Sequence, residues 1–420
     1  MVCGYYGFSF LVCVGELSLS LIVFLVCTSG VSSLEVKDLS ERVKMLPVSA
    51  VRVLSDSAKS TDVIRLTAGD PDFKTPKHIV DAALREAEEG LTHYTSSAGL
   101  PQLREAIARK LRVENALSYD PMKQIAVTNG GTGALALTFL ALLNPGDRVL
   151  IPDPGWTNYK PMIIAAGGEA IGYPLRRADG FKPNISEIEA MVTDRIKVIV
   201  VNTPSNPTGA VYDKDLLGEL VELAVKKNLY IVSDEVYEKV IFDGHSHVST
   251  AALPGAFERT ITVNSLSKTY AMTGWRVGYA AGPEKVVSAI SALNSALNSC
   301  PSSVSQAAAI AAINGPQDVV DKMVQEYRNR RNYFIASLNE IPGVEALRPA
   351  GAFYAFADFS SIEKSSVKMN QRLLSEARVV GIPGSAFGNA GEGYIRFSFA
   401  SSMEELKEAV NRMTVTFRRG

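Results

Sequence analysis

An alternation of short apolar runs with helix-like segments, between residues 125 and 281, most constrains how this chain folds. Runs such as Ile125–Thr128, Arg148–Ile151 and Thr260–Asn264 have the length and the β-branched content of buried strands. Helix-like segments, for example Tyr159–Ala166, fall between most of them. Strands that alternate with helices form a mostly parallel sheet with helices on both faces. We therefore predict an α/β fold for this region.

The alternation weakens from about Ile313 onward. A long charged helix, 318–338, leads to two short strands, 353–356 and 394–399, and to a closing helix, 403–417. This pattern predicts a smaller α+β domain, which the N-terminal segment joins. The predicted division is an apolar extension at 1–35, the N-terminal part of the small domain at 36–70, the large domain at 71–312 and the C-terminal small domain at 313–420.

The first 35 residues differ in kind from the rest. Leu17–Cys27 is apolar, and no Lys or Arg precedes Lys37, so the basic region of a secretory signal is missing. The apolar run is also shorter than the roughly 20 residues of a membrane span. Three interpretations remain: a weak signal or anchor, a divergent targeting segment, or a translation start placed too far upstream. We favour the last of these.

Composition narrows the classes of partner and compartment. A net charge of −1 gives no indication of nucleic acid or an anionic membrane as partner. Beyond Cys27 the only cysteine is Cys300, which excludes a disulfide framework there and favours a reducing, cytoplasmic compartment. His245 and His247 lie in a loop rich in Gly, Asp and Ser, which we interpret as a solvated loop rather than a metal site. We predict no metal.

Ser265–Arg276 follows the apolar run Thr260–Asn264, so its polar side chains lie where a strand ends. Ligands of open α/β sheets bind at that edge. A partly desolvated Lys268 there would have a lowered pKa and a nucleophilic amine, suited to a Schiff base with an aldehyde. Neighbouring hydroxyls and Arg276 could hold a phosphate on that aldehyde. Taken alone, a Ser-x-Ser-Lys segment is more often a surface turn.

Glycines at 130, 131 and 133 join another strand to a helix start, where free N–H groups and the helix dipole favour an anion. The segment matches neither G-x-G-x-x-G nor a Walker pattern, which disfavours nucleotide binding and a nicotinamide dehydrogenase.

Four other side chains come after predicted strands or lie within one. Asn206 lies between two prolines and could donate to a ring oxygen. Asp234 ends a strand, where a buried carboxylate needs a cation such as a pyridinium nitrogen, although periodicity alone does not separate it from Glu235. Trp156 either stacks on a flat cofactor or belongs to the core. Arg396 in an apolar strand binds either a substrate carboxylate or a structural carboxylate.

From about Val36 to Gly420 the sequence resembles the class I aminotransferases of the aspartate aminotransferase type, which are pyridoxal-phosphate enzymes of fold type I. The matching segments, in order and spacing, are Asn206–Gly209, Ser233–Tyr237, Ser265–Lys268 with Arg276, and Gly393–Arg396. The resemblance implies a large domain with a mostly parallel seven-stranded sheet covered by helices, plus a smaller α+β domain. It also implies a homodimer with shared active sites.

The resemblance further implies the role of each site residue. Lys268 would form the Schiff base with pyridoxal 5'-phosphate and then carry the proton between the substrate and the cofactor. Asp234 would pair with the pyridine nitrogen, while Tyr237 and Asn206 would bind the ring oxygen. The phosphate would be held by Gly131, Thr132, Ser265, Ser267 and Arg276, with Tyr94 reaching the phosphate of the neighbouring subunit. Trp156 would stack on the ring, and the substrate would contact Arg396, Gly69, Trp156 and Asn206.

The implied reaction is ping-pong transamination between an L-amino acid and a 2-oxo acid. Thr132 stands where relatives of the aspartate and prephenate type often carry a lysine, so we expect broad specificity, with aspartate or aromatic donors and 2-oxoglutarate as acceptor. Two alternatives stay open: a pyridoxal-phosphate lyase or synthase of the same fold, and a non-catalytic pyridoxal-phosphate-binding regulatory protein.

Overall fold

The computed structural model describes residues 38–46 and 62–418, and Glu41–Gly420 forms one compact unit. The expectations for residues 1–35 lie outside the described residues. In the described part of the chain, no helix has both the length and the apolar character that a membrane crossing requires.

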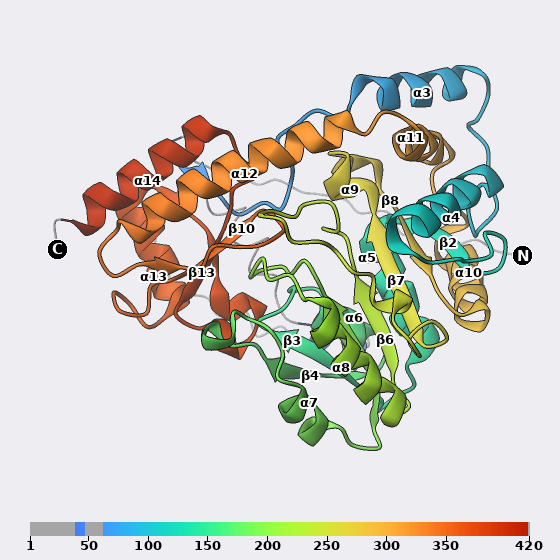
Figure 1. Ribbon diagram of the computed structural model, residues 1–420, viewed down its shortest axis with the longest axis horizontal. Coiled ribbons are helices and arrows are strands. Elements are labelled where there is room, and N and C mark those ends of the chain that lie inside the picture. The colour runs from blue at the N-terminus through green and yellow to red at the C-terminus, as the bar shows by residue number, and fades with distance from the viewer. Residues whose placement is uncertain (1–37, 47–61, 419–420) are drawn as a thin grey trace, which may run out of the picture. The chain divides into compact units, whose positions relative to one another are not determined.

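A seven-stranded mixed sheet lies at the centre of the larger part of this unit (Figure 1). Its order is β2-β8-β7-β6-β5-β3-β4, and only β8 runs antiparallel to its neighbours. The strands are β2 (Ile125–Asn129), β3 (Arg148–Asp153), β4 (Glu169–Pro174), β5 (Ile196–Asn202), β6 (Tyr230–Asp234), β7 (Thr260–Ser265) and β8 (Val277–Ala281). The predicted mostly parallel sheet of seven strands is confirmed.

Helices cover both faces of this sheet because its strands are apolar on both sides. Val198 and Val200 of β5 point into one core, whereas Ile199 and Val201 point into another, as the period of two requires. The first core is closed by α5 (Gly130–Leu142), α6 (Tyr159–Ala165) and α10 (Glu284–Asn298). The other face carries α4 (Pro101–Asn115), α7 (Ile185–Met191), α8 (Lys214–Lys226) and α11 (Ser303–Asn314), with α3 (Lys77–Glu88) against α11.

A four-stranded antiparallel sheet forms the smaller α+β part, with the order β12-β13-β10-β9. Its strands are β9 (Glu345–Ala346), β10 (Tyr354–Asp358), β12 (Ile382–Pro383) and β13 (Tyr394–Ser398). Its helices are α12 (Asp318–Asn339), α13 (Ser366–Arg372) and α14 (Met403–Phe417), and α12 and α14 lie side by side (Figure 1). A short α1 (Glu41–Lys44) lies near the start of the described chain, and β1 (Ile64–Arg65) pairs in parallel with β11 (Val379–Val380).

The carboxyl ends of the parallel strands meet at one edge of the large sheet. There β5, β6 and β7 end at Asn202, Asp234 and Ser265, and β2 ends immediately before α5. This edge is where open α/β sheets bind ligands.

Candidate active site

A cavity of about 450 Å³ opens at this edge, and residues from both sheets line it. The large sheet contributes its strand ends and the loops that follow them. Tyr354 of β10 and Arg396 of β13 close the other side, together with the segment Thr67–Asp70 after β1. The sequence-predicted residues that line the cavity are Gly69, Gly131, Thr132, Trp156, Asn206, Asp234, Tyr237, Ser265, Ser267, Lys268, Arg276 and Arg396.

Lys268 extends from α9 (Leu266–Thr269), directly after β7. Its ammonium donates to the carbonyl of Gly69 and lies 5.9 Å from the ring centre of Phe353. Burial lowers the pKa of Lys268 to about 8, Arg396 and Arg276 act in the same direction, and Asp70 opposes them. The predicted lowering is thereby confirmed, and about a tenth of the amine is uncharged at pH 7.

An anion cradle lies at the start of α5. The N–H groups of its first turn have no partners within the helix, and Arg276 reaches over them. A Cβ on Gly130, where φ is +72°, would lie 2.6 Å from Nη2 of Arg276. Ser265 caps α9, and its hydroxyl donates to Ser267 at 2.9 Å. Backbone N–H groups, two hydroxyls and an exposed guanidinium are the donors that a phosphate prefers.

Asp234 is buried and points into the cavity. Its Oδ2 accepts a hydrogen bond of 2.6 Å from the hydroxyl of Tyr159. Burial raises the pKa of Asp234 to about 6, although the Tyr159 bond opposes that rise. No cationic side chain pairs with this carboxylate in the described ranges. Glu235 is not part of the lining, so the structure separates two carboxylates that the sequence left unresolved.

Asn206 and Tyr237 both line the cavity, and each is held by a neighbouring residue. The side-chain oxygen of Asn202 accepts from the backbone N–H of Asn206 at 2.9 Å, which fixes the loop after β5. The hydroxyls of Tyr237 and Tyr354 lie 2.7 Å apart. Hydroxyl and amide groups held in this way are preorganised to bind an anionic oxygen.

Arg396 is buried on β13, and its guanidinium faces neutral groups. It donates to Oδ1 of Asn206 at 3.0 Å and to the carbonyl of Thr67 at 2.5 Å, and it packs over the rings of Tyr354 and Phe387. Its Nε has no partner. No carboxylate pairs with it anywhere in 38–46 or 62–418, so the interpretation as a structural salt bridge is wrong. A buried guanidinium without an anion favours an anionic ligand.

Three tyrosines remain to be compared with the sequence-based expectation, which assigns Tyr94 to the cofactor of a neighbouring subunit rather than to its own. Tyr94 lies outside the lining of this cavity, and its side chain is 87% exposed. Conversely, Tyr159 and Tyr354 contact predicted residues but were not identified from the sequence. Their partners lie 75 and 117 residues away, so no local pattern points to them.

Comparison with known proteins agrees with this geometry. Residues 61–413 match the family "Aminotransferase class I and II". The chain belongs to the class I and II aminotransferases. An aspartate aminotransferase of Pyrococcus abyssi is 42% identical over 383 residues, covering 90% of this chain and 98% of the relative. An aromatic-amino-acid aminotransferase of Thermococcus litoralis is 41% identical, covering 89% and 97%. A solved structure, the Thermus thermophilus aspartate aminotransferase with maleate, has 40% identity and a TM-score of 0.87, covering 91% and 100%.

This aminotransferase therefore acts on amino acids with pyridoxal 5'-phosphate, the cofactor of its family. The cavity fits that group. It offers an unpaired buried carboxylate for a cationic ring nitrogen, an anion cradle for a phosphate and a desolvated amine for an aldehyde. It also retains a second anion site at Arg396 for a substrate carboxylate.

The interpretation of both loop histidines as solvated is wrong for His247. His245 is exposed, but only 9% of the His247 side chain is accessible, and its Nε2 lies 2.9 Å from Oε2 of Glu235. The turn-forming residues around it suggested solvent exposure. The buried carboxylate that holds the imidazole is not visible as a local pattern.

Proposed function

We propose that the enzyme catalyses ping-pong transamination between L-amino acids and 2-oxo acids, with broad donor specificity and 2-oxoglutarate as acceptor. Relatives named for aspartate, aromatic amino acids and prephenate support a donor range of this kind. The cavity supports it too. The cations in its described lining are Lys268, Arg276 and Arg396, and each already has a function in cofactor or α-carboxylate binding.

A second carboxylate therefore meets neutral groups in this chain's part of the cavity. Thr132 and Asn158 offer a hydroxyl and an amide there. Neutral donors bind a carboxylate more weakly than a guanidinium does, but they do not reject an apolar side chain by leaving a charge buried and unpaired. Aromatic donors and dicarboxylates would then share one site.

The proposed roles of the residues follow from their contacts. Pyridoxal 5'-phosphate, when bound, supplies an aldehyde carbon and an electron-accepting ring. Lys268 would provide the amine that attaches it and the nitrogen that moves a proton between the substrate Cα and the cofactor carbon that carried the aldehyde. Asp234 keeps the ring nitrogen protonated, Tyr237 and Asn206 bind the ring oxygen, and Trp156 stacks on the ring. The remaining cofactor and substrate ligands are Gly131, Thr132, Ser265, Ser267 and Arg276 at the phosphate, and Arg396, Gly69, Trp156 and Asn206 at the substrate.

We further propose a homodimer with shared active sites. Tyr94 is exposed and does not line its own cavity, which leaves its hydroxyl available to the phosphate of a neighbouring subunit. The domain limits 36–70, 71–312 and 313–420 and a cytoplasmic location belong to the same proposal. Sedimentation would detect the dimer. Mixing Tyr94→Ala and Lys268→Ala subunits would test sharing, because a hybrid dimer regains one intact site.

The visible absorbance of the purified full-length enzyme with pyridoxal 5'-phosphate tests the donor range. Single amino acids are added without an acceptor, and conversion of the cofactor to its amine form is followed. Aromatic amino acids and aspartate should both cause conversion, and 2-oxoglutarate should reverse it. Conversion by only one donor class would contradict broad specificity, and continuous release of oxo acid without an acceptor would indicate a lyase.

A further inference from the structure

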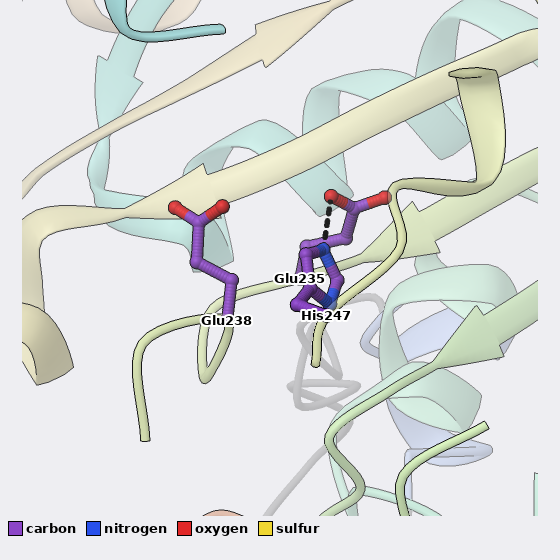
Figure 2. A group of neighbouring side chains, drawn as sticks. All are labelled: Glu235, Glu238 and His247. Carbon is purple, nitrogen blue, oxygen red and sulfur yellow. Dashed lines mark hydrogen bonds and ion pairs between the residues drawn. The ribbon is translucent and has the colours of Figure 1, made fainter. Parts of the chain in front are cut away.

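The turn that carries Asp234 has two faces. Asp234, Val236 and Tyr237 line the cavity, whereas Glu235 and Glu238 point away from it into a buried polar cluster. Figure 2 shows the two glutamates of this cluster with His247. Residues 234–238 thus direct some side chains to the cofactor site and others to the interior.

Glu238 is the group of the cluster that bonds to α4 and to the end of β7. Only 7% of it is exposed. Its Oε1 accepts from the ammonium of Lys110 on α4 and from Nδ2 of Asn264 at 2.7 Å, and its Oε2 accepts from Nδ2 of Asn115 at 2.8 Å. Burial raises the pKa of Glu238, but Lys110 and His247 outweigh burial and hold the pKa at about 2. The carboxylate is therefore ionised, and every group that it contacts is a donor.

The second carboxylate of the cluster is equally satisfied. Oε1 of Glu235 accepts from the Ser233 hydroxyl at 2.8 Å and from the Thr250 N–H at 3.2 Å, and Oε2 accepts from the Ser249 hydroxyl at 2.6 Å besides contacting His247. Potential metal-ligand atoms of Glu235, Glu238 and His247 do lie within 4.8 Å of one another. The four carboxylate oxygens are already in hydrogen bonds, however, and an ammonium occupies the space beside Glu238. This arrangement disfavours a metal ion.

Asn264 connects the cluster to the other side of the cofactor site. Its Nδ2 donates to Glu238, while its Oδ1 accepts from the backbone N–H of Ser265 at 2.7 Å. Ser265 lines the cavity and caps the helix that carries Lys268. Glu238 is itself part of the turn that carries Asp234 and Tyr237, and it reaches the end of β7 through the side-chain amide of Asn264. One carboxylate is therefore linked to both strand ends.

We propose that Glu238 is a positioning residue for the cofactor: its carboxylate, held by Lys110, fixes the turn after β6 and, through Asn264, the end of β7. The proposal rests on the proposed cofactor contacts of Asp234, Tyr237 and Ser265. Those residues come from two neighbouring strands, β6 and β7, whose last backbone bond, from the Glu235 N–H to the Val263 carbonyl, is 2.9 Å long. A side-chain bond beyond that ladder would further restrain the relative placement of the strand ends. The Glu238–Asn264 bond supplies one outside the cavity, where no ligand competes for it.

The test is Glu238→Gln in the full-length enzyme. An amide has the same size but brings two N–H donors into a group of donors, so one oxygen contact becomes a donor–donor contact, and Lys110 keeps only the more distant Glu114, at 3.5 Å, as an ion-pair partner. Titration of the apoenzyme with pyridoxal 5'-phosphate, followed by absorbance, should give a dissociation constant about tenfold higher, the size expected for one hydrogen bond to a charged group. Asn264→Ala should give a similar loss. The double variant should lose clearly less affinity than the sum, since both act through one path.

Asp243→Asn is the matched control. It removes the charge from another pair, the one with buried Arg331, whose Nη atoms lie 2.8 Å from the carboxylate and which lies outside the cavity lining. Its cofactor affinity should equal that of the wild type even where its melting temperature falls as far. Equal affinity losses in Glu238→Gln and this control would overturn the proposal. If Glu238→Gln does not fold, Asn264→Ala decides alone, and wild-type affinity there refutes the proposal.

Two further outcomes would assign a change in cofactor affinity to a different cause. The first is a metal ion that the purified wild type holds in stoichiometric amount and Glu238→Gln lacks. If added Zn²⁺ then restored cofactor affinity, the proposal would be replaced by a metal site. The second is that the wild type binds the cofactor tightly and that Asp234→Asn and Ser265→Ala bind it equally well. This result would refute the proposed cofactor contacts instead. Glu238 would then have no positioning function to serve.

Discussion

Removal of one hydroxyl, in Tyr159→Phe, should shift the pH range in which the enzyme holds its cofactor. The Tyr159 hydroxyl donates to Oδ2 of Asp234 at 2.6 Å, and both side chains are buried; the carboxylate also accepts a long bond, of 3.5 Å, from the Val236 N–H. A hydrogen bond to a charged group contributes about 1.5–3 kcal/mol. Since about 1.4 kcal/mol corresponds to a factor of ten in the acid constant, its loss should raise the pKa of Asp234 by about one to two.

The pKa of Asp234 in the wild type is about 6, above the ordinary value of 3.8. The protonated carboxyl cannot neutralise a cationic ring nitrogen, so cofactor affinity should weaken as the pH falls through about 6. In Tyr159→Phe the same loss should occur near pH 7 to 8. The cofactor phosphate and Lys268 also titrate in this region, but they do so in both proteins, and the difference between the two profiles reports on Asp234.

Dissociation constants for pyridoxal 5'-phosphate between pH 5 and 9 check this reasoning. Tyr173→Phe is the control, because Tyr173 is buried and donates one bond of 2.8 Å to the carbonyl of Val200. It should lower stability without moving the profile. A Tyr159→Phe profile that coincides with the wild-type profile would refute the idea that this hydroxyl sets the charge of Asp234.

Four other perturbations have expected outcomes. Arg396→Gln should weaken substrate binding by about 2–5 kcal/mol, measured as a higher half-saturating concentration at unchanged cofactor affinity. Lys268→Ala should abolish transamination. In the wild-type apoenzyme, the rate of cofactor attachment should rise with pH, with a midpoint near 8, the pKa of Lys268. Glu235 raises the pKa of His247 although burial of the imidazole opposes the rise. The stability that this pair contributes is therefore complete below pH 6.5 and is lost as the pH rises through the raised pKa. The urea midpoints of the wild type and His247→Gln should accordingly converge as the pH rises. Gly278→Ala should lower the free energy of unfolding by about 1–3 kcal/mol or more in denaturant melts, because its Cβ would lie 2.5 Å from the backbone at the start of α5.

Local sequence patterns predict much of the fold. The strands β5 and β6 are apolar on both faces and β7 on one, and polar residues lie at or directly after their ends, so both their existence and the edge at which they end can be predicted. The edge strand β4 cannot be predicted in this way. Its residues include Gly172 and the exposed Glu169, so it lacks the continuous apolar run of its neighbours. The helix α5 begins at Gly130, so the glycines of the predicted anion site lie within its first turn.

What could not be predicted depends on contacts between distant segments. The bond between Tyr159 and Asp234 joins α6 to β6, and the pair Tyr237 and Tyr354 joins the two sheets. Neither partner carries a local signature, because a tyrosine before an apolar helix is an ordinary core residue. The prediction that His247 is solvated was wrong for the same reason, because its burial depends on a contact with a distant segment. Its neighbours are turn formers, and only the fold brings Glu235 to it.

The distribution of paired and unpaired charge connects these observations. On the interior face of the turn after β6, Glu238 is bonded to Lys110, and Glu235 to His247. On the cavity face, Asp234 has no cation, and Arg276 and Arg396 have no anion within the described ranges. Asp234 and Arg396 are buried, and an unpaired buried charge costs free energy, so the apoenzyme carries that cost at the site where ligand charges of opposite sign can remove it. Binding should therefore stabilise the fold by more than the cofactor's contact area suggests, and most of that gain should disappear in variants that neutralise the same charges.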